Sequence, residues 1–357
     1  MHGLSKEKKE KVYIIILNWN GWEDTIECLE SIMKIDYDPY QIIVCDNESK
    51  DNSLDNIIKW AKGELDVNFI GDESLRDKVL PGFQKPVSYS IYSQTEALER
   101  KINSGSDSKL ILIRNNGNIG FAAGNNVGIN YALLNGDCDY VWLLNNDTIV
   151  DKYSLSELIQ KIQLNPSAGM CGSTLLYYEN PSIIQALGGD FYNSWTGFNQ
   201  HIGGLKTYTK GNNYSFVKSQ LSFLVGASIL VRVSLLKEVG LLCEDYFLYY
   251  EELDWAVRAK KKSYTLEYAS NSLVYHKVGA STGGSSFKMR QKSIISDFYL
   301  IRNRLLITHK FFPYALPTVY LSLAITLFRR LIRFQWNRIF MIARIIWTKG
   351  NCKFDYN

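Results

Sequence analysis

A short apolar run from Tyr140 to Leu144 is followed directly by three polar residues, Asn145, Asn146 and Asp147. An uninterrupted apolar run of this length is typical of a parallel strand that is buried on both faces. The polar residues would then lie at the carboxyl end of the strand, where open α/β sheets bind their ligands. One carboxylate beside two amide oxygens suits a divalent cation whose other ligands are water and phosphate oxygens. The same residues also favour turns, so on their own they leave a plain turn equally open.

Strand and helix patterns alternate along the first 150 residues. Apolar runs predict strands at 12–17, 41–45, 66–70, 110–113 and 140–144, and helical spacing predicts helices at 23–34, 51–62 and 124–134. This alternation predicts an α/β fold with a mainly parallel central sheet and flanking helices. The polar stretch at about 71–108 contains two prolines and interrupts the pattern, so we interpret it as an insertion or long loop with a short helix at 94–102.

The C-terminal part of the chain differs from the rest. The net charge of +4 is too small to imply nucleic acid, but after Lys288 basic residues are frequent and acids nearly absent. Residues 311–328 are uncharged and apolar, and 329–349 alternate apolar residues with Arg329, Arg330, Arg333, Arg338 and Arg344. This pattern predicts a basic amphipathic helix, which could pack on the body with a solvated arginine face or lie on a membrane. The scarcity of acids favours the membrane.

Cysteine usage and the N-terminus bear on the compartment. Six scattered cysteines without a CxxC pair suggest buried thiols in a reducing environment, and the first eleven residues lack the apolar core of a secretory signal. We therefore expect a cytoplasmic protein, peripheral on the inner face of the cell membrane.

Two further polar segments follow predicted strands. Asp46 ends the second strand, and a carboxylate there can accept the imide N–H of a uracil or thymine ring. Asn18 ends the first strand and would share the same crevice. The Gly- and Asn-rich segment from Asn118 to Asn126 precedes a helix, whose N-terminus favours an anion. A helix cap after Asp46 and a tight turn at the glycines are the simpler alternatives.

Glu251 and Glu252 are adjacent acids in an aromatic setting. If they are buried, desolvation and like charge raise one pKa above the ordinary value of about 4.3, which suits a general base. From charge alone, an exposed first turn of a helix is the better explanation. His276 lies at a predicted strand end and is a candidate metal or phosphate ligand, although a lone histidine is more often structural. His2, His201 and His309 have no comparable context.

Seven segments occur in a fixed order: 18–20, 46–49, 118–126, 145–147, 223–232, 246–255 and 276–281. Together they resemble the family-2 glycosyltransferases of the GT-A fold over about residues 11–305, and most of all the bacterial rhamnosyltransferase-like branch. A later element, from Tyr299 to Arg304, resembles an Arg-Asn segment of this family to which we assign no role at this point.

The resemblance implies a domain organisation and a set of site residues. It implies a GT-A catalytic domain at 1–285, with a nucleotide-binding half at 11–150 and an acceptor-binding half at 151–285, followed by a helical extension at 286–357. Glu252 would be the catalytic base, with Glu251 second, and Asp147 and His276 would hold Mg²⁺ or Mn²⁺. The implied nucleotide-sugar site comprises Asn18, Asn20, Asp46, Asn118, Gly120, Phe121, Asn125, Asn145 and Asn146.

The implied activity is inverting transfer of a sugar from a nucleotide diphosphate donor. L-rhamnose from dTDP-rhamnose would pass to a hydroxyl of a cell-surface polysaccharide or lipid-linked glycan precursor, as in cell-wall or O-antigen biosynthesis. A UDP-hexose or UDP-galactofuranose donor and a non-catalytic sugar-nucleotide-binding subunit are the alternatives. Two positions depart from the family pattern: Asn145 replaces the first acid of the DxD motif, and Glu252 stands where the family usually has Asp.

Overall fold

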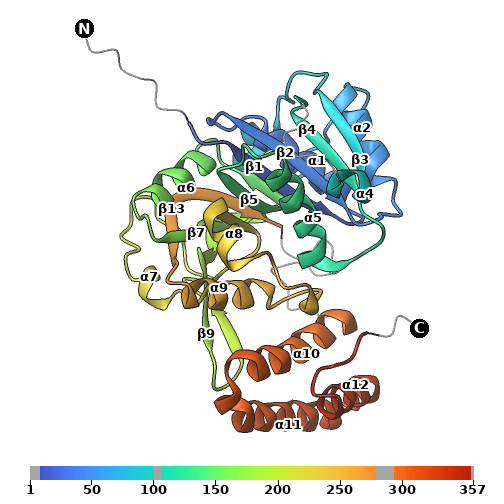
Figure 1. Ribbon diagram of the computed structural model, residues 1–357, viewed down its shortest axis with the longest axis vertical. Coiled ribbons are helices and arrows are strands. Elements are labelled where there is room, and N and C mark those ends of the chain that lie inside the picture. Colours follow the sequence, from blue (N-terminus) through green and yellow to red (C-terminus); the bar gives the residue numbers. More distant parts are fainter. Residues whose placement is uncertain (1–8, 100–106, 278–292, 355–357) are drawn as a thin grey trace.

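The structure, a computed structural model, describes residues 9–99, 107–277 and 293–354 (Figure 1). Its strands are β1 (Val12–Asn18), β2 (Tyr40–Asp46), β3 (Tyr89–Ser93), β4 (Leu110–Arg114), β5 (Tyr140–Asn145), β6 (Thr148–Val150), β7 (Ala168–Tyr177), β8 (Asn180–Leu187), β9 (Gly189–Asn193), β10 (Phe198–His201), β11 (Phe223–Leu224), β12 (Ser228–Arg232) and β13 (Thr265–His276). Its helices are α1 (Trp22–Ile32), α2 (Ser53–Lys62), α3 (Arg76–Val79), α4 (Gln94–Leu98), α5 (Gly120–Leu134), α6 (Ser154–Gln163), α7 (Val217–Gln220), α8 (Val233–Val239), α9 (Glu251–Lys261), α10 (Ile294–Phe311), α11 (Leu316–Ile332) and α12 (Trp336–Trp347). Three short 3-10 helices are η1 (Glu73–Leu75), η2 (Glu244–Tyr246) and η3 (Pro313–Ala315).

One central sheet organises the body of the molecule. Its strand order within the described residues is β3-β4-β2-β1-β5-β12-β7-β13-β6, and β8 pairs with β7 outside this path. The five strands from β3 to β5 are parallel, whereas β12 runs antiparallel to both of its neighbours. The predicted α/β fold with a mainly parallel sheet is therefore confirmed.

The two faces of the sheet carry two separate apolar cores. Along β1, Tyr13 and Ile15 point to the face that α5 covers, and Ile14 and Ile16 point to the face of α1 and α2. Both faces are buried because helices cover each of them, which is why β1 has no polar residue before Asn18. Figure 1 shows these helices on the two sides of the strands.

The register of the parallel strands brings their carboxyl ends to one edge. Asn18 lies opposite Asp46 in the pair of β1 and β2, and Leu17 lies opposite Asn145 in the pair of β1 and β5. The polar residues that follow three different strands therefore meet at the same edge of the sheet, as the strand pattern predicts.

The segment at 71–108 differs from the long loop that we predicted. No strand forms at 66–70; instead β3 adds to β4 as the parallel edge strand of the sheet. The helix expected at 94–102 is the shorter α4, and residues 100–102 lie outside the described ranges. The carboxylate of Glu30 fixes this region to the body, accepting hydrogen bonds from Phe83 N at 2.6 Å and Lys85 Nζ at 2.8 Å.

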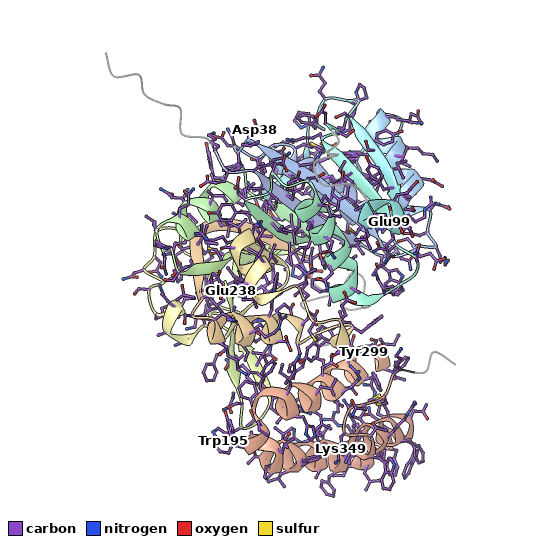
Figure 2. The ribbon with its side chains drawn as sticks, viewed as in Figure 1. Asp38, Glu99, Trp195, Glu238, Tyr299 and Lys349 are labelled. Atoms are coloured by element: carbon purple, nitrogen blue, oxygen red, sulfur yellow. The ribbon has the colours of Figure 1, made fainter. Side chains whose placement is uncertain are left out.

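A second, small sheet and three helices extend the body on one side. Strands β10, β9 and β11 form an antiparallel sheet that reaches toward α10, α11 and α12. Trp195 at the tip of the β9–β10 hairpin contacts Tyr314, with ring centroids 5.1 Å apart, and Figure 2 shows it beside these helices. The boundary that we predicted at 285/286 lies outside the described residues.

The arginine-rich segment at 329–349 is two helices rather than the single helix that we predicted. Helix α11 ends at Ile332 and α12 begins at Trp336. Arg330 and Arg338 both pair with Asp297 of α10, so these two arginines hold the helices together and are absent from an outer basic face. Arg329, Arg333 and Arg344 are exposed.

Close packing of α5 on the sheet generates a stability prediction. A Cβ at Gly128 would lie 2.7 Å from Ile15 Cγ2 and 3.0 Å from Cys45 Sγ, both in buried strands. We expect Gly128→Val to lower the free energy of unfolding by about 1–3 kcal/mol, because it overpacks the core. Urea denaturation would measure this change. The control, Asn130→Ala on the same helix, should change it by less than about 0.5 kcal/mol. Equal effects of the two substitutions would contradict close packing at Gly128.

Candidate active site

A cavity of about 530 Å³ lies at the carboxyl edge of the sheet, between the strand ends, the turn before α9 and the small sheet. Nine of the predicted site residues line it: Asn118, Gly120, Phe121, Asn145, Asn146, Asp147, Glu251, Glu252 and His276. These residues come from four separate segments of the chain, so the fold brings together most of the predicted site.

Four predicted residues do not line the cavity: Asn18, Asn20, Asp46 and Asn125. The buried carboxylate of Asp46 is fully engaged within the protein. Its Oδ1 accepts from Asn18 Nδ2 and Ser49 Oγ, both at 2.6 Å, and its Oδ2 accepts from Ser49 N at 3.0 Å. The next residue in the chain, Asn47, does line the cavity. Asp46 itself is buried and does not line the cavity surface at which we expected it.

The other two residues have local structural partners. The exposed Asn20 accepts a hydrogen bond from Lys50 N through Oδ1, at 2.7 Å. The amide of Asn125 donates to Phe121 O at 2.9 Å, one turn earlier in α5. Asn125 therefore supports the loop at the start of α5 from behind.

The loop at the start of α5 approaches the turn before α9 closely. Gly120 has a φ of 87°, and a Cβ there would lie 2.6 Å from the ring and carbonyl of Phe247. Asn47 Nδ2 donates to Gly120 O at 3.2 Å, and Phe121 N donates to Phe247 O at 2.7 Å. The glycine is required here by both its backbone conformation and the space available.

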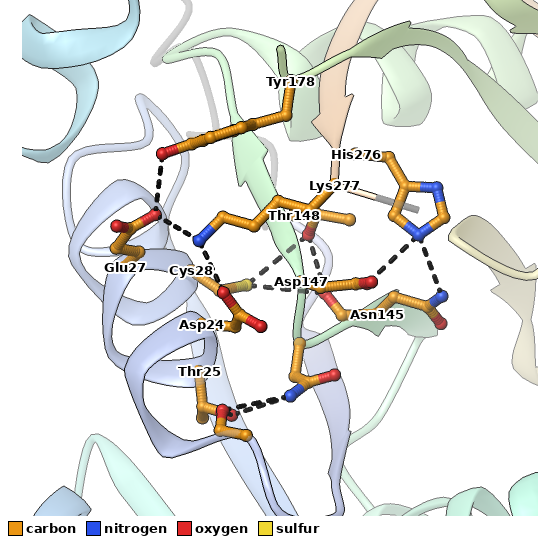
Figure 3. A network of polar contacts seen from close by, with 12 residues as sticks. Asp24, Thr25, Glu27, Cys28, Asn145, Asp147, Thr148, Tyr178, His276 and Lys277 are labelled. Carbon is orange, nitrogen blue, oxygen red and sulfur yellow. Dashed lines mark hydrogen bonds and ion pairs between the residues drawn. The ribbon is translucent and has the colours of Figure 1, made fainter. Parts of the chain in front are cut away.

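Asp147 and His276 form the polar centre of the cavity (Figure 3). His276 Nε2 lies 3.1 Å from Asp147 Oδ1, and Asn145 Nδ2 lies 3.4 Å from the same nitrogen. The Oδ1 atom is buried but accepts no hydrogen bond of good geometry within the described residues. His276 Nδ1 faces Gln185 Oε1 at 3.0 Å, and the tautomer that donates this hydrogen bond leaves the lone pair of Nε2 free for a cation.

A largely buried ion-pair network lies beside Asp147 (Figure 3). Lys277 Nζ contacts Asp24 Oδ1 at 2.6 Å and Glu27 Oε2 at 2.7 Å, and Tyr178 donates to Glu27 at 3.3 Å. Burial raises the pKa of Asp147, but His276 and Lys277 outweigh burial and hold that pKa below its ordinary value. Asp147 is therefore an ionised carboxylate at neutral pH.

The residues around Asp147 fit a divalent cation. They offer a buried carboxylate oxygen without a hydrogen-bond partner, an imidazole lone pair and a nearby side-chain amide. Within the described ranges no group of three or more His, Cys, Asp and Glu side chains forms a complete cage. Such a partial set suits Mg²⁺ or Mn²⁺, whose remaining ligands are then water and substrate phosphate oxygens.

Glu251 and Glu252 start α9 on the other side of the cavity. Glu251 is 2% exposed, and its Oε2 has no hydrogen-bond partner among the described residues. Burial and the neighbouring Glu252 raise the pKa of Glu251 well above its ordinary range. Burial raises the pKa of the half-buried Glu252 to about 7, and the Asp190 carboxylate contributes to the shift. Charge alone predicted an exposed first turn of a helix. Both residues do lie in the first turn of α9, but the prediction that this turn is exposed is wrong.

The structure adds polar residues that our reading of the sequence missed. Asp190 of β9 and His201 of β10 lie directly opposite each other, with His201 Nδ1 donating to Asp190 Oδ1 at 2.5 Å. Asn199 also donates to Asp190, and all three residues line the cavity together with Gln185. Burial lowers the pKa of His201, but Asp190 outweighs burial and raises it overall. A β-hairpin centred on residues 195–196 is the sequence pattern that could have predicted this pairing.

A known relative is similar to part of this chain. The chain is 28% identical over 153 residues to the low-salt glycan biosynthesis hexosyltransferase Agl10 of Haloferax volcanii, covering 42% of this chain and 46% of the relative. The match thus spans about half the length of that relative.

Solved structures share the fold at low sequence identity. GalNAc-T7, solved with UDP, GalNAc and Mn²⁺, has a TM-score of 0.54 and 13% identity, covering 85% of this chain and 48% of that one. A mannosyltransferase from Pyrobaculum calidifontis, solved with GDP-Man and Mn²⁺, has a TM-score of 0.49 and 12% identity, covering 96% of this chain and 86% of that one. The likeness to GalNAc-T7 confirms the expected GT-A fold.

Two family models match the chain itself. The model of glycosyl transferase family 2 matches residues 13–74, which include β1, β2 and the polar residues that follow them. The model of glycosyl transferase family group 2 matches residues 140–348, which is more than half of the chain and includes Asp147, Glu251, Glu252 and His276. The chain therefore belongs to the family 2 glycosyltransferases.

Proposed function

We propose that this protein is an inverting, metal-dependent glycosyltransferase that moves a sugar from a nucleotide diphosphate to an acceptor hydroxyl. The observation that carries the proposal is the pairing of two kinds of group across one cavity. Asp147 and His276 face it as cation ligands, and Glu252 faces it as a carboxyl group whose pKa is raised to about 7. A base with a pKa near neutrality is matched to removing a proton from a hydroxyl at physiological pH.

The transfer needs a single displacement. Glu252 takes the proton of the acceptor hydroxyl, whose oxygen forms a bond to the anomeric carbon while the bond from that carbon to the diphosphate breaks. Attack opposite the leaving group inverts the anomeric configuration, and no covalent enzyme intermediate is required. The nucleoside diphosphate leaves with the electron pair of the broken bond.

A divalent cation would be held by Asp147 and His276, next to Asn145, and would neutralise charge on the leaving diphosphate. Among the described residues that line the cavity there is no lysine or arginine, whereas Asp147, Asp190, Glu251 and Glu252 are all present. A diphosphate would therefore meet carboxylates and no cationic Lys or Arg side chain in this lining, which supports the need for a metal ion.

We assign the nucleotide to the half at 11–150 and the acceptor to the half at 151–285. The first donor that we propose is dTDP-L-rhamnose, on the resemblance of the motifs, and a UDP-hexose or UDP-galactofuranose is the alternative. The acceptor would be a growing cell-surface polysaccharide or lipid-linked glycan. The glycan-biosynthesis hexosyltransferase among the relatives supports an acceptor of this class.

We further propose that α11 and α12 bind the inner face of the cell membrane. One helical segment in the described part of the chain, Pro313–Ile332, is long and apolar enough to cross a membrane, and only 17% of its most apolar window is buried. The exposed apolar residues of this region include Phe328, Phe334, Phe340 and Trp347, the last of them 87% exposed. Exposed aromatic residues close to exposed arginines suit the interface of an anionic membrane.

The direct test of the activity is release of nucleoside diphosphate in the presence of Mn²⁺. The donors to compare are dTDP-rhamnose, UDP-galactofuranose, UDP-glucose and GDP-mannose, each with and without a lipid-linked glycan fraction. Transfer from one donor supports the proposal and identifies the nucleotide. A protein that binds a donor but releases no diphosphate in any combination would be a non-catalytic subunit.

The base assignment predicts a pH dependence. Because Glu252 must be ionised to accept a proton, kcat should fall as the pH decreases through about 7. Glu252→Gln should lower kcat by about 10²–10⁴-fold and remove this acidic limb. Steady-state kinetics from about pH 5.5 to 8.5 would measure both effects. The control is Glu99→Gln, an exposed acid remote from the cavity. A variant with the wild-type profile would show that another group is the base.

The cation assignment predicts a stability effect that does not require turnover. Mn²⁺ with UDP or dTDP should raise the melting temperature of the wild type, because a ligand at about 100 times its Kd stabilises by about 2.7 kcal/mol. Asp147→Asn keeps the side-chain shape and should lose this shift, whereas the exposed Asp55→Asn on α2 should keep it. A full Mn²⁺-dependent shift in Asp147→Asn would exclude Asp147 as a ligand.

The membrane assignment predicts a loss of vesicle binding in a surface variant. Burial of each large apolar side chain contributes about 2 kcal/mol, so Phe340→Ser with Trp347→Ser should weaken binding by about 100-fold or more. Cosedimentation with phosphatidylglycerol–phosphatidylethanolamine vesicles would measure it. The control is Leu164→Ser, at a residue of the body that is 76% exposed. Equal sedimentation of variant and wild type would contradict a membrane-facing role for α12.

A further inference from the structure

The turn between η2 and α9 has an unusual backbone. Phe247, Tyr249 and Tyr250 all have positive φ, at 61°, 68° and 76°. Large side chains are rare in this region of conformational space, and such residues persist only where their surroundings hold them. The turn leads directly into Glu251 and Glu252, so whatever holds it also places the two acids.

The side chain of Asn303 holds this turn. Asn303 lies on α10 and is fully buried, and its Nδ2 donates to three carbonyl oxygens of the turn: Tyr246 at 2.8 Å, Leu248 at 2.8 Å and Tyr249 at 2.9 Å. The two N–H bonds of this one amide group therefore serve three of the four carbonyls from Tyr246 to Tyr249, so one N–H is shared between two of them. The fourth, that of Phe247, accepts from Phe121 N.

Arg302 completes the attachment from the same helix. Its Nη1 donates to Asp245 O and to Asn303 Oδ1, both at 2.8 Å, which orients the Asn303 amide. Its Nε donates to Cys352 O at 2.7 Å, after the end of α12. The ring of Tyr299, one turn earlier in α10, stacks on Phe247 with centroids 4.8 Å apart.

The turn in its held conformation touches both sides of the cavity. Phe247 packs against Gly120 and accepts a hydrogen bond from Phe121 N at 2.7 Å, at the start of the loop that lines the nucleotide side. Three residues after Tyr249, Glu252 lies against Gly226 on the opposite side, where a Cβ would be 2.3 Å from its Oε1. A shift of the turn would therefore move the acids relative to the loop.

We propose that Asn303, oriented by Arg302, is a positioning residue of the active site: it fixes the turn at Tyr246–Tyr250 and thereby the spacing between the acid pair and the loop at Asn118–Phe121. Helix α10 is then a structural part of the catalytic centre. The catalytic consequence rests on the function proposed above, whereas the structural consequence does not.

The test compares two substitutions of Asn303 with a matched control. Asn303→Asp keeps the shape and removes the amide donors, and Asn303→Ala removes the whole group. Thr308→Val is the control, because Thr308 is also fully buried on α10 but its hydroxyl donates to Arg304 O within the helix, at 2.7 Å. Hydrogen exchange at residues 118–127 and 245–253 reports the structure without any donor, and steady-state kinetics report catalysis.

We expect both Asn303 variants to accelerate exchange in the two segments and to lower kcat by about 100-fold, since small misplacements of catalytic groups have effects of this size. The donor KM should change by less than about threefold, because the groups that bind the donor remain. Thr308→Val should leave exchange and kcat as in the wild type. If neither Asn303 variant folds, Arg302→Gln should show the same pattern with a smaller loss of about tenfold.

Wild-type exchange in the two segments of a folded Asn303 or Arg302 variant would overturn the proposal. A parallel fall in kcat and rise in KM in both the Asn303 variants and the control would also overturn it, because general loosening of α10 would then explain the effect. If the wild type released no diphosphate from any donor, the proposed function would fail, and the exchange result would still decide whether Asn303 holds the turn.

Discussion

The parallel register of β2, β1 and β5 is the constraint on which the rest of the site depends. Because these strands end level with one another, Asn18, Asp46 and Asn145 are forced to one edge of the sheet. Polar side chains gathered at such an edge cannot all point into solvent, and here they bond to one another or face the cavity. The fold thus supplies half of the site before any loop is considered.

The other half of the site depends on β12 and α9, which lie outside the parallel strands. Strand β12 runs antiparallel to β5 and brings Ala227, whose carbonyl accepts from Asn145 N at 3.1 Å, to the floor of the cavity. The neighbouring Gly226 leaves the space that Glu252 occupies. Burial of Glu252 in this space disfavours its ionised form and is the main physical origin of its raised pKa, to which the Asp190 carboxylate adds. The acids that we propose for catalysis are therefore groups whose burial opposes stability.

The strands and helices of the nucleotide half could be predicted because their signals are local. Residues of β1 and β5 are apolar without interruption, and the polar residues after them mark the strand ends. The edge strand β3 could not be predicted in this way, because it is only half-buried and has no continuous apolar run. The Glu251–Glu252 pair could be located from sequence only by resemblance, since charge alone favours an exposed turn.

Residues that act through long-range pairing could not be found in this way. Asp190 and His201 meet only because the β9–β10 hairpin places them opposite each other, and they lie eleven positions apart along the chain. Likewise, we predicted an outward basic face for 329–349, but Arg330 and Arg338 pair instead with Asp297. Asp297 lies more than thirty residues earlier in the chain. A pattern within one helix reports which face is charged, but it does not report whether a partner on another helix neutralises it.

The C-terminal helices are attached directly to the part of the molecule that carries the cavity. Helix α10 bonds the carbonyls that precede Glu251, and it also carries Asp297, to which the arginines of α11 and α12 attach. The exposed aromatic surface of α11 and α12 is therefore connected through Asp297 and α10 to the turn that precedes the acid pair. A membrane that held this surface, as we propose, would also hold α10 and with it the turn that precedes Glu251.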